Sequence, residues 1–434
     1  MVEKNILRVG IAGLGNVGSE VVRQIIEKVD LLQERCNKEI KVVAVSARDK
    51  SKKRDLNLDK ITWYNDPLDL ANDKNIDVVV ELIGGEKSVA YNLCKESLLN
   101  GKHVVTANKA MLAHYGSDFA QLAFEQNKIF AFEAAVAGGI PIIKVLKESL
   151  VSSKFKKISG IMNGTCNYIL STMEATSREF SDILQEAQRL GYAESDPSFD
   201  IDGIDTAHKL AIVASIAFGA KIDFSQIYVE GIRHIALTDI NYAKDLGYKI
   251  KLLGVCSQKN NMLEHAVYPV MVAFNSPIAN ISNANNAILI RSDTIDNLLL
   301  TGPGAGGAAT ASAVIADICD IACGRSSYMF NKTPNHLTNF KVLPIKDHEC
   351  AYYLRLKVLD KTGVLAIVTS IFNKAGISMD SLLQKSSKSD LEGLAVDIVG
   401  ITHITSEDKI KFALAELAKI DSVVEAPHII RVDK

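Results

Sequence analysis

L-R-V-G-I-A-G-L-G-N-V-G, residues 7–18, decides the fold of this chain. Its first six residues form an apolar run of the length of a buried parallel strand, and a helical apolar pattern follows from Val17. Between them, Gly13 allows a tight turn, Gly15 lets a pyrophosphate approach the backbone, and Gly18 lets the helix pack closely on the strand. A lone G-x-G-x-x-G is weak evidence, but a strand before it and a helix after it strengthen the inference. We therefore expect a dinucleotide site made by Gly13, Leu14, Gly15, Asn16, Val17 and Gly18.

The second strand, expected at residues 41–46, should end near the adenosine ribose of that nucleotide. An acidic residue there binds the 2′-hydroxyl of NAD, whereas an arginine suits the 2′-phosphate of NADP. The sequence continues S-A-R-D-K, which places Arg48 and then Asp49 after the strand. We favour NADP(H), with Arg48 as its ligand. NAD(H) remains possible, because Asp49 is the alternative ribose ligand and Arg48 is equally readable as an exposed loop charge.

Further strands alternate with helical segments. Residues 77–83, 102–106 and 128–134 are apolar runs of strand length, and this alternation predicts a doubly wound parallel sheet of Rossmann type over residues 1–135. The first of these runs ends at Gly84, at the sheet edge where ligands collect, so Gly84 joins the expected cofactor site. The second leads into A-N-K, which ends at Lys109. Lys109 is therefore expected between cofactor and substrate.

The bulk properties exclude several classes of protein. The chain has 434 residues, enough for two or three domains, and 49 basic against 51 acidic residues leave a net charge of −2. Without a basic cluster, nucleic acid is not expected as a partner. No apolar stretch reaches the ~20 residues that span a bilayer, and no signal-peptide pattern is seen at the start. Seven cysteines without a C-x-x-C pair are typical of reduced thiols, so we expect a cytoplasmic protein.

The middle of the chain carries G-Y-A-E-S-D-P-S-F-D-I-D-G-I-D-T-A-H-K-L, residues 191–210. Asp205 and Lys209 stand at i and i+4, hence on one face of a predicted helix. Such a pair is usually a solvated surface bridge of small energetic value. Here the helix is apolar nearly all round, which indicates burial, and a buried ion pair is costly unless it is used. Lys209 could donate a proton to an alkoxide that develops on a substrate, and Glu194 could bind a substrate ammonium.

These motifs resemble those of homoserine dehydrogenases. The other matching segments are T-A-N-K, E-A-A-V-A-G-G-I-P, G-I-M-N-G-T and G-P-G-A-G-G, and the resemblance covers roughly residues 6–325. It implies reversible NAD(P)-dependent reduction of L-aspartate 4-semialdehyde to L-homoserine. It also implies that Lys209 transfers the proton while Asp205 and Glu194 assist and Asp200 adds a polar contact. A non-catalytic amino-acid sensor and a different amino-acid dehydrogenase on the same architecture are the alternatives.

The resemblance implies further features that side-chain patterns do not show. Residues 136–302 would form an α+β substrate and dimerisation domain in a homodimer or homotetramer. The helix around 303–324 would return to the nucleotide domain and place Gly306 near the cofactor. A sodium ion would be held by the backbone carbonyls of Glu133, Val136, Gly138 and Ile140. Cys166 stands where the family usually has a second threonine, which weakens one local polar contact.

A polar, proline-punctuated linker is expected over residues 325–349, followed by a separate domain over residues 350–434. The order of predicted elements there is βαββαβ, a ferredoxin-like arrangement that resembles an ACT regulatory domain. The resemblance is carried by D-K-T-G-V-L, residues 360–365, and by G-I-S-M, residues 376–379. It implies an amino-acid effector, with threonine suspected, near Asp360, Gly363 and Ile377. A ligand-free dimerisation module is the alternative.

Overall fold

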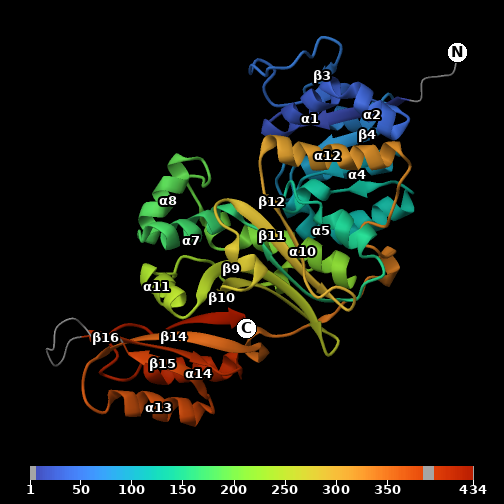
Figure 1. The fold of residues 1–434 in the computed structure, drawn as a ribbon. Coiled ribbons are helices and arrows are strands. Elements are labelled where there is room, and N and C mark those ends of the chain that lie inside the picture. The colour runs from blue at the N-terminus through green and yellow to red at the C-terminus, as the bar shows by residue number, and fades with distance from the viewer. Residues whose placement is uncertain (1–5, 385–394, 434) are drawn as a thin grey trace.

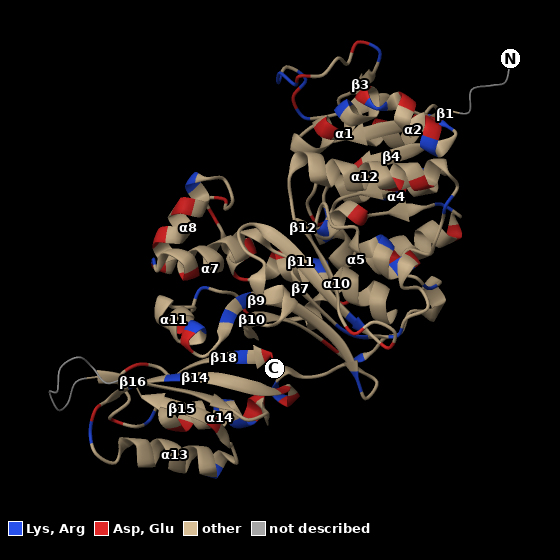
Figure 2. Ribbon diagram, viewed as in Figure 1, with Lys and Arg blue, Asp and Glu red and all other residues tan. Residues whose placement is uncertain are grey.

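A computed structural model describes residues 6–384 and 395–433 of the chain. Figure 1 shows an N-terminal domain, where the nucleotide site is expected, a central domain and a C-terminal domain, and the central domain joins the other two. Basic and acidic residues are interspersed along the ribbon of all three parts (Figure 2). Among the described residues, none of the helices has the length and apolar character needed to span a membrane.

The N-terminal domain is the predicted doubly wound sheet. Six parallel strands lie in the order β3-β2-β1-β4-β5-β6, which is the Rossmann order. The strands are β1 Ile6–Ala12, β2 Glu39–Ser46, β3 Thr62–Tyr64, β4 Val78–Glu81, β5 His103–Thr106 and β6 Phe130–Ala131. The helices are α1 Asn16–Glu27, α2 Val29–Cys36, α3 Leu68–Asn72, α4 Val89–Leu99 and α5 Lys109–Glu125. All four residues of β4 are buried, as expected for a strand that is covered on both faces.

The strand expected over residues 128–134 is shorter than the sequence pattern suggested. Only Phe130–Ala131 pair with the sheet, and a 3₁₀ turn, Glu133–Ala135, follows. The backbone N–H of Glu133 donates to Asp317 Oδ2 at 2.8 Å, so a side chain on a distant helix takes the bond that a strand partner would have taken. A long-range contact of this kind leaves no local periodicity in the sequence.

The central domain packs helices on one face of an antiparallel sheet. Its strands are β7 Phe155–Ile161, β8 Tyr228–Val229, β9 Tyr248–Lys259, β10 Met262–Ala273, β11 Asn285–Ser292 and β12 Leu298–Pro303. Its helices are α6 Ile142–Lys144, a π-helical turn Val145–Ser149, α7 Gly164–Thr176, α8 Phe180–Arg189, α9 Ser198–Ile201, α10 Ile204–Phe218 and α11 Leu237–Asp245, with 3₁₀ turns at Phe224–Gln226 and Pro277–Asn280. From β12 the chain returns to the nucleotide domain as α12, Gly307–Ala322, which lies beside α1 (Figure 1).

Residues 325–349 run from the nucleotide domain along the surface of the central domain. Phe330 is buried against Phe132 and Gly116 of the nucleotide domain, Met329 and Leu337 are buried in the same core cluster, and the short strand β13, Lys341–Val342, pairs with β10. Two further 3₁₀ turns, Pro334–His336 and Ile345–Asp347, punctuate the segment. Although the segment is rich in polar residues and proline, a few apolar side chains hold it in place.

The C-terminal domain has the predicted βαββαβ order, with one additional short strand. Its elements are β14 Glu349–Leu359, α13 Val364–Ala375, β15 Met379–Gln384, β16 Ala395–Thr402, β17 Thr405–Ser406, α14 Glu407–Leu417 and β18 His428–Asp433. The first two residues of the third predicted strand, 393–394, lie outside the described residues. Leu354, Leu356, Val368, Phe372 and Ile398 belong to its own hydrophobic core.

The two sheets are joined edge to edge. Strand β18 pairs in parallel with β10, with Val270 opposite Arg431 and Val272 opposite Asp433, so the central and C-terminal domains share one twelve-stranded sheet. A buried ion pair supports this seam: Arg355 on β14 donates to Asp239 on α11, with Nε–Oδ1 at 2.7 Å. The Tyr353 hydroxyl donates to the same carboxylate at 3.1 Å. The C-terminal domain is therefore fixed to the central domain by backbone and charge together.

We predict that Asp239→Ala destabilises the seam strongly. Removing one partner of a buried ion pair leaves an uncompensated charge, here Arg355, at a cost of ~3–5 kcal/mol. Calorimetric unfolding should show this as a lowered transition. The control is Lys419→Ala, because Lys419 and its partner Glu416 have side chains that are 70% and 39% exposed and such pairs contribute ~1 kcal/mol or less. Equal effects of the two substitutions would contradict the buried role of Asp239.

Candidate active site

The glycine-rich turn between β1 and α1 is shaped to receive a phosphate. Gly13 has φ +98°, and a Cβ added there would lie 2.5 Å from the Leu82 carbonyl oxygen. A Cβ on Gly18 would lie 1.8 Å from the Gly13 carbonyl oxygen, whereas a Cβ on Gly15 would meet nothing within 4 Å. The first and last glycines therefore allow the backbone to close up, and the middle one faces open space. Gly15 also caps α1 without any side chain, which leaves the helix N-terminus free for an anion.

A second helix N-terminus faces the same turn. Gly306, with φ +125°, precedes α12, and a Cβ on Gly307 would lie 3.2 Å from the Asn16 carbonyl oxygen. A Cβ on Gly306 itself would meet nothing within 4 Å. The returning helix thus closes one wall of the nucleotide pocket, and the structure places Gly306 beside the turn of residues 13–18.

Gly84 is held at the sheet edge by a buried carboxylate. Glu81, the last residue of β4, accepts the backbone N–H groups of Ile83 at 2.7 Å and Gly84 at 2.9 Å. Its other oxygen accepts the Thr106 hydroxyl at 2.5 Å. The neighbouring strand ends β4 and β5 are therefore joined by one acidic side chain. Glu81 was not singled out from the sequence, where it stands inside the apolar run of residues 77–83.

Lys109 begins α5, and its neighbours fix its position. The side chain of Asn108 caps the helix by accepting the Met111 backbone N–H at 3.1 Å. Its amide donates to the Gly85 carbonyl at 2.8 Å, which joins this helix start to the Gly84–Gly85 turn. From there the Lys109 ammonium reaches Asp205 Oδ1 at 2.8 Å. Lys109 thus lies between the Gly84–Gly85 turn and the central domain.

Lys209 and Asp205 form a buried pair on α10. The Lys209 ammonium donates to Asp205 Oδ2 at 2.8 Å and to the Met162 carbonyl at 2.6 Å. Their side chains are only 9% and 4% exposed. Burial lowers the pKa of Lys209, against the opposing effect of Asp205. For Asp205, burial alone would raise the pKa, but the charges of Lys209 and Lys109 outweigh it and hold the pKa far below its usual range. One carboxylate thus holds two ammonium groups.

Asn163 connects this pair to Asp200. Its amide donates to Asp205 Oδ2 and to Asp200 Oδ1, both at 2.8 Å, while its oxygen caps α7 by accepting the Cys166 backbone N–H. The Thr165 hydroxyl lies 3.2 Å from the other Asp200 oxygen. Burial raises the pKa of Asp200. Asn163 was missed as a site residue, although asparagine just before a predicted helix in G-I-M-N-G-T is an N-cap signal.

Glu194 and Arg48, two residues expected at the site, lie apart from the cluster that Asp205 forms with its lysine and asparagine partners. Glu194 is exposed in the segment between α8 and α9, where its carbonyl accepts the Gln188 amide at 3.0 Å. Arg48 is exposed on the loop after β2. It is Arg54 that reaches back to the glycine-rich turn, where its Nε donates to the Leu14 carbonyl at 3.1 Å and its guanidinium lies 5.5 Å from the Trp63 ring centre.

The loop expected to hold sodium is buried and tightly constrained. The Glu133 carboxylate accepts the backbone N–H groups of Ile143 and Lys144 at 2.9 and 2.8 Å, and burial raises its pKa to about 8. Gly138 has φ +50°, and a Cβ there would lie 2.6 Å from the Gly304 carbonyl oxygen. Val136 and Ile140 are buried beside it. Within the described ranges, no group of three or more His, Cys, Asp or Glu side chains is placed to hold a metal ion.

The effector residues expected in the C-terminal domain lie at the two ends of α13: Asp360 and Gly363 precede the helix, and Ile377 follows its C-terminal end. Gly363 caps this helix with φ +89°, and a Cβ there would meet nothing within 4 Å. Asp360 accepts the Gln384 amide at 3.3 Å, and Ile377 is buried. The turn is thus open on the side of Gly363.

Together, the Rossmann sheet, the open glycine turn and the Lys–Asp–Lys cluster beside it define a nicotinamide-nucleotide oxidoreductase. Family models agree: "Homoserine dehydrogenase, NAD binding domain" matches residues 13–133, "Homoserine dehydrogenase" matches 141–319, and "ACT domain" matches 352–422. The chain therefore belongs to the homoserine dehydrogenase family and carries a C-terminal ACT domain, which confirms the resemblance.

Individual relatives match over the full length. A homoserine dehydrogenase of Pseudomonas aeruginosa is 42% identical over 434 residues, with 99% of each chain covered. The crystal structure of one from Thiobacillus denitrificans superposes with a TM-score of 0.92 at 40% identity and covers 99% of this chain and 98% of that one. A hyperthermophilic archaeal homoserine dehydrogenase, solved in complex with NADPH, superposes with a TM-score of 0.64 at 26% identity and covers 74% of this chain and 99% of that one.

We predict that Gly15→Val weakens nucleotide binding without unfolding the chain. A side chain at this position meets open space and an ordinary backbone conformation, so folding should tolerate it, but it would occupy the room of the pyrophosphate. Steric conflict of this size costs ~1–3 kcal/mol, so affinity should fall by about 5- to 150-fold. Fluorescence titration with NADH and NADPH measures this, and circular dichroism checks the fold. Unchanged affinity for both nucleotides would place the pyrophosphate elsewhere.

Proposed function

We propose that this chain catalyses the reversible, nicotinamide-dependent reduction of L-aspartate 4-semialdehyde to L-homoserine. The observation that carries the proposal is the buried carboxylate of Asp205, which holds Lys209 on one oxygen and Lys109 on the other. Reduction of an aldehyde develops negative charge on its oxygen, and an ammonium group beside that oxygen stabilises the charge and supplies the proton. The proposal extends to this chain the reaction after which its relatives are named.

In this mechanism Lys209 is the proton donor. An ammonium has three N–H donors, and Asp205 and Met162 accept two of them, so one remains for the substrate oxygen. When bound, the nicotinamide supplies or accepts the hydride. Asp205 keeps Lys209 in place and favours its charged form, while burial lowers the pKa of Lys209 and so eases release of the proton. In the reverse direction the neutral amine of Lys209 accepts the proton from the alcohol.

The amino-acid end of the substrate needs groups of opposite sign to its ammonium and carboxylate. We assign the ammonium to Glu194, with Asp200 beside Asn163 as the inner polar contact. Because Glu194 is exposed in the structure, this assignment requires residues 191–199 to approach the cluster when substrate binds. Lys109, whose side chain is 33% exposed, can turn one donor toward the substrate while it keeps Asp205.

We predict that Lys209→Met lowers kcat by about 10²- to 10⁴-fold, as loss of a general acid or base does, while nucleotide affinity is kept. Oxidation of L-homoserine, followed by nicotinamide absorbance, measures the loss.

In the wild type, oxidation should become faster as pH rises through the lowered pKa of Lys209, with a midpoint below the ~10.4 of an ordinary lysine. Lys209→Arg should lose this pH-dependent step, because arginine stays charged. A methionine variant with more than about a tenth of wild-type kcat would contradict the role of Lys209.

NADP(H) is the cofactor we favour over NAD(H). The loop after β2 carries Arg48, Lys50 and Arg54, and both Lys50 and Arg54 lie over the Trp63 ring, 5.9 and 5.5 Å from its centre. This gives a cationic rim near the end of β2, where the 2′-phosphate of NADP would lie. Asp49 is turned to the Ser51 backbone N–H and hydroxyl at 2.8 and 2.6 Å, which leaves it less available to a ribose.

We predict that Arg48→Ala weakens NADPH by ~1.5–3 kcal/mol and changes NADH affinity little, because only NADPH offers a 2′-phosphate to a charge-assisted bond. Arg54→Ala, measured in parallel, tells which arginine makes the contact. Titration with both nucleotides at fixed ionic strength gives the four affinities. If both variants lose NADH and NADPH equally, neither arginine reads the 2′-phosphate and the preference for NADP(H) has no basis.

Three finer features complete the proposal. A sodium ion on the carbonyls of Glu133, Val136, Gly138 and Ile140 would stabilise the loop that joins the two catalytic domains. An amino-acid effector, with threonine suspected, would bind near Asp360, Gly363 and Ile377. We also propose a cytoplasmic homodimer or homotetramer, with domain boundaries at residues 135, 302 and 349. The conformation of Gly363, open on one side, supports close approach of a small ligand there.

A further inference from the structure

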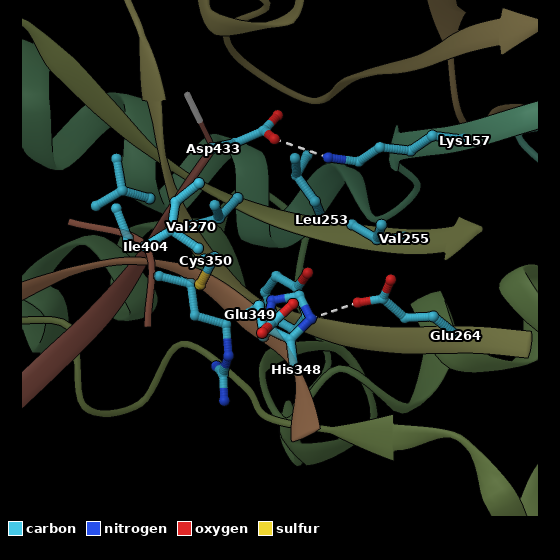
Figure 3. Close-up of a pocket in the computed structure, with 14 residues that line it drawn as sticks. Lys157, Leu253, Val255, Glu264, Val270, His348, Glu349, Cys350, Ile404 and Asp433 are labelled. Atoms are coloured by element: carbon cyan, nitrogen blue, oxygen red, sulfur yellow. Dashed lines mark hydrogen bonds and ion pairs between the residues drawn. The ribbon is translucent and has the colours of Figure 1, made fainter. Parts of the chain in front are cut away.

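A cavity of about 230 Å³ lies at the seam between the central and C-terminal domains. Strands β7, β9 and β10 line it from the central domain, and the start of β14 and the end of β18 line it from the ACT domain (Figure 3). It is far larger than the ~30 Å³ of one water and smaller than the ~300–1,000 Å³ of pockets for drug-sized ligands. Its size therefore suits a metabolite with few atoms. Junctions between domains are common places for such sites.

Two ion pairs cross the seam on opposite sides of this cavity. The Lys157 ammonium on β7 meets Asp433 Oδ1 on β18 at 2.7 Å, and Glu264 on β10 pairs with His348. Leu253 and Val255 lie between the two pairs (Figure 3). Burial lowers the pKa of His348, but hydrogen bonds to Cys350 and Glu264 outweigh burial and raise it to about 9, so this ring is charged at neutral pH. The cavity thus has charges of both signs around an apolar floor, which is the surface formed by Leu253 and Val255.

Several of its polar groups have bonding capacity to spare. The Lys157 ammonium has three donors, and among the described residues it has one partner, Asp433. The second oxygen of Asp433 and the hydroxyl of Tyr268 accept or donate no hydrogen bond within the described part of the chain. The Tyr268 ring is fixed by the Arg431 guanidinium, which lies 4.6 Å from its centre. A cation, an anion and a hydroxyl therefore face the same small space.

We propose that this seam cavity binds a free α-amino acid, with its carboxylate on Lys157, its ammonium on Asp433 and its side chain on Leu253 and Val255. A zwitterion carries both charges at the spacing of one carbon, and a short side chain suits the apolar floor. A simple anion or cation would engage only one member of the Lys157–Asp433 ion pair, whereas a zwitterion can bond to both. The seam site is distinct from the turn at Gly363, which lies at the other end of β14 from the cavity.

A ligand in the seam would act on the junction between the domains. Because residues of both domains line the cavity, a ligand bound there stabilises their docking, and β18 of the ACT domain pairs directly with β10 of the central sheet. This inference rests on the proposed amino-acid regulation of the enzyme and names a second place for the effector. Its failure is distinguishable from failure of the dehydrogenase reaction, since binding and turnover are measured separately.

The test is isothermal titration calorimetry of the full-length enzyme, first with L-threonine and then with the other protein amino acids; L-homoserine is left out because it binds the catalytic site. Lys157→Met and Asp433→Asn remove one charge each from the cavity. Asp360→Ala probes the ACT turn. Lys259→Met is the matched control, because Lys259 forms another ion pair across the seam, with Glu349 at 2.9 Å, but does not line the cavity. Thermal unfolding of each variant shows whether it is folded.

If the seam is the site, Lys157→Met and Asp433→Asn should each weaken binding by about tenfold or more, as loss of a charge-assisted bond does, while Lys259→Met and Asp360→Ala bind as the wild type. Loss confined to Asp360→Ala would place the effector at the ACT turn and overturn the proposal. Equal weakening by all four variants would also overturn it, because it would reflect general loosening of the seam. An active wild-type enzyme that binds no amino acid would overturn it while the dehydrogenase function stands.

Discussion

The desolvated carboxylate of Asp205 is the constraint on which the catalytic arrangement depends. A charge at this depth is tolerable only with partners, and the chain provides three: Lys209 from the same helix, Lys109 from the nucleotide domain and the amide of Asn163. The three partners come from α10, α5 and the start of α7. Because all three bond to the one buried carboxylate, three elements of two domains meet at this point. The nucleotide domain and Lys209 are thereby held in a fixed position relative to each other.

The sequence predicted well those features of the structure that depend on the spacing of residues close together in the chain. The turn at Gly13, the i, i+4 pair of Asp205 and Lys209 and the βαββαβ order of the last domain all follow from short-range periodicity and turn chemistry. The elements that were missed depend on distant partners. The strand before Glu133 ends early because Asp317 on α12 takes its backbone N–H, and Asn163 matters because it touches two aspartates far along the chain. Pairing of β18 with β10 has no local signature either.

Glu133 and Asp317 show how the two catalytic domains are closed on each other. Burial raises the pKa of Glu133 to about 8 and that of Asp317 to about 7, so both carboxyl groups lie where protonation and ionisation compete near neutral pH. Their hydrogen bonds are to backbone N–H groups at the crossing between the nucleotide sheet and the central domain. Glu133 and Asp317 would repel each other if both were charged. Through their hydrogen bonds to backbone N–H groups, they fix the loop beside the cofactor turn.

The shared sheet determines how the ACT domain can influence catalysis. A regulatory domain on a flexible tether can only block or release a surface, but here β18 extends the sheet that carries β9 and β10, and α10 packs on β9 and β10. Helix α10 bears Asp205 and Lys209, so the path from the ACT domain to Lys209 passes through one sheet and one helix in direct contact. An interior packed at crystal density responds to strain by switching between discrete arrangements rather than by bending smoothly. The seam is also part of the main hydrophobic core, because Ala351, Tyr353 and Ile430 of the ACT domain belong to the same buried cluster as residues of the central domain. A shift at the seam is therefore passed on through packed side chains as well as through ion pairs and backbone pairing.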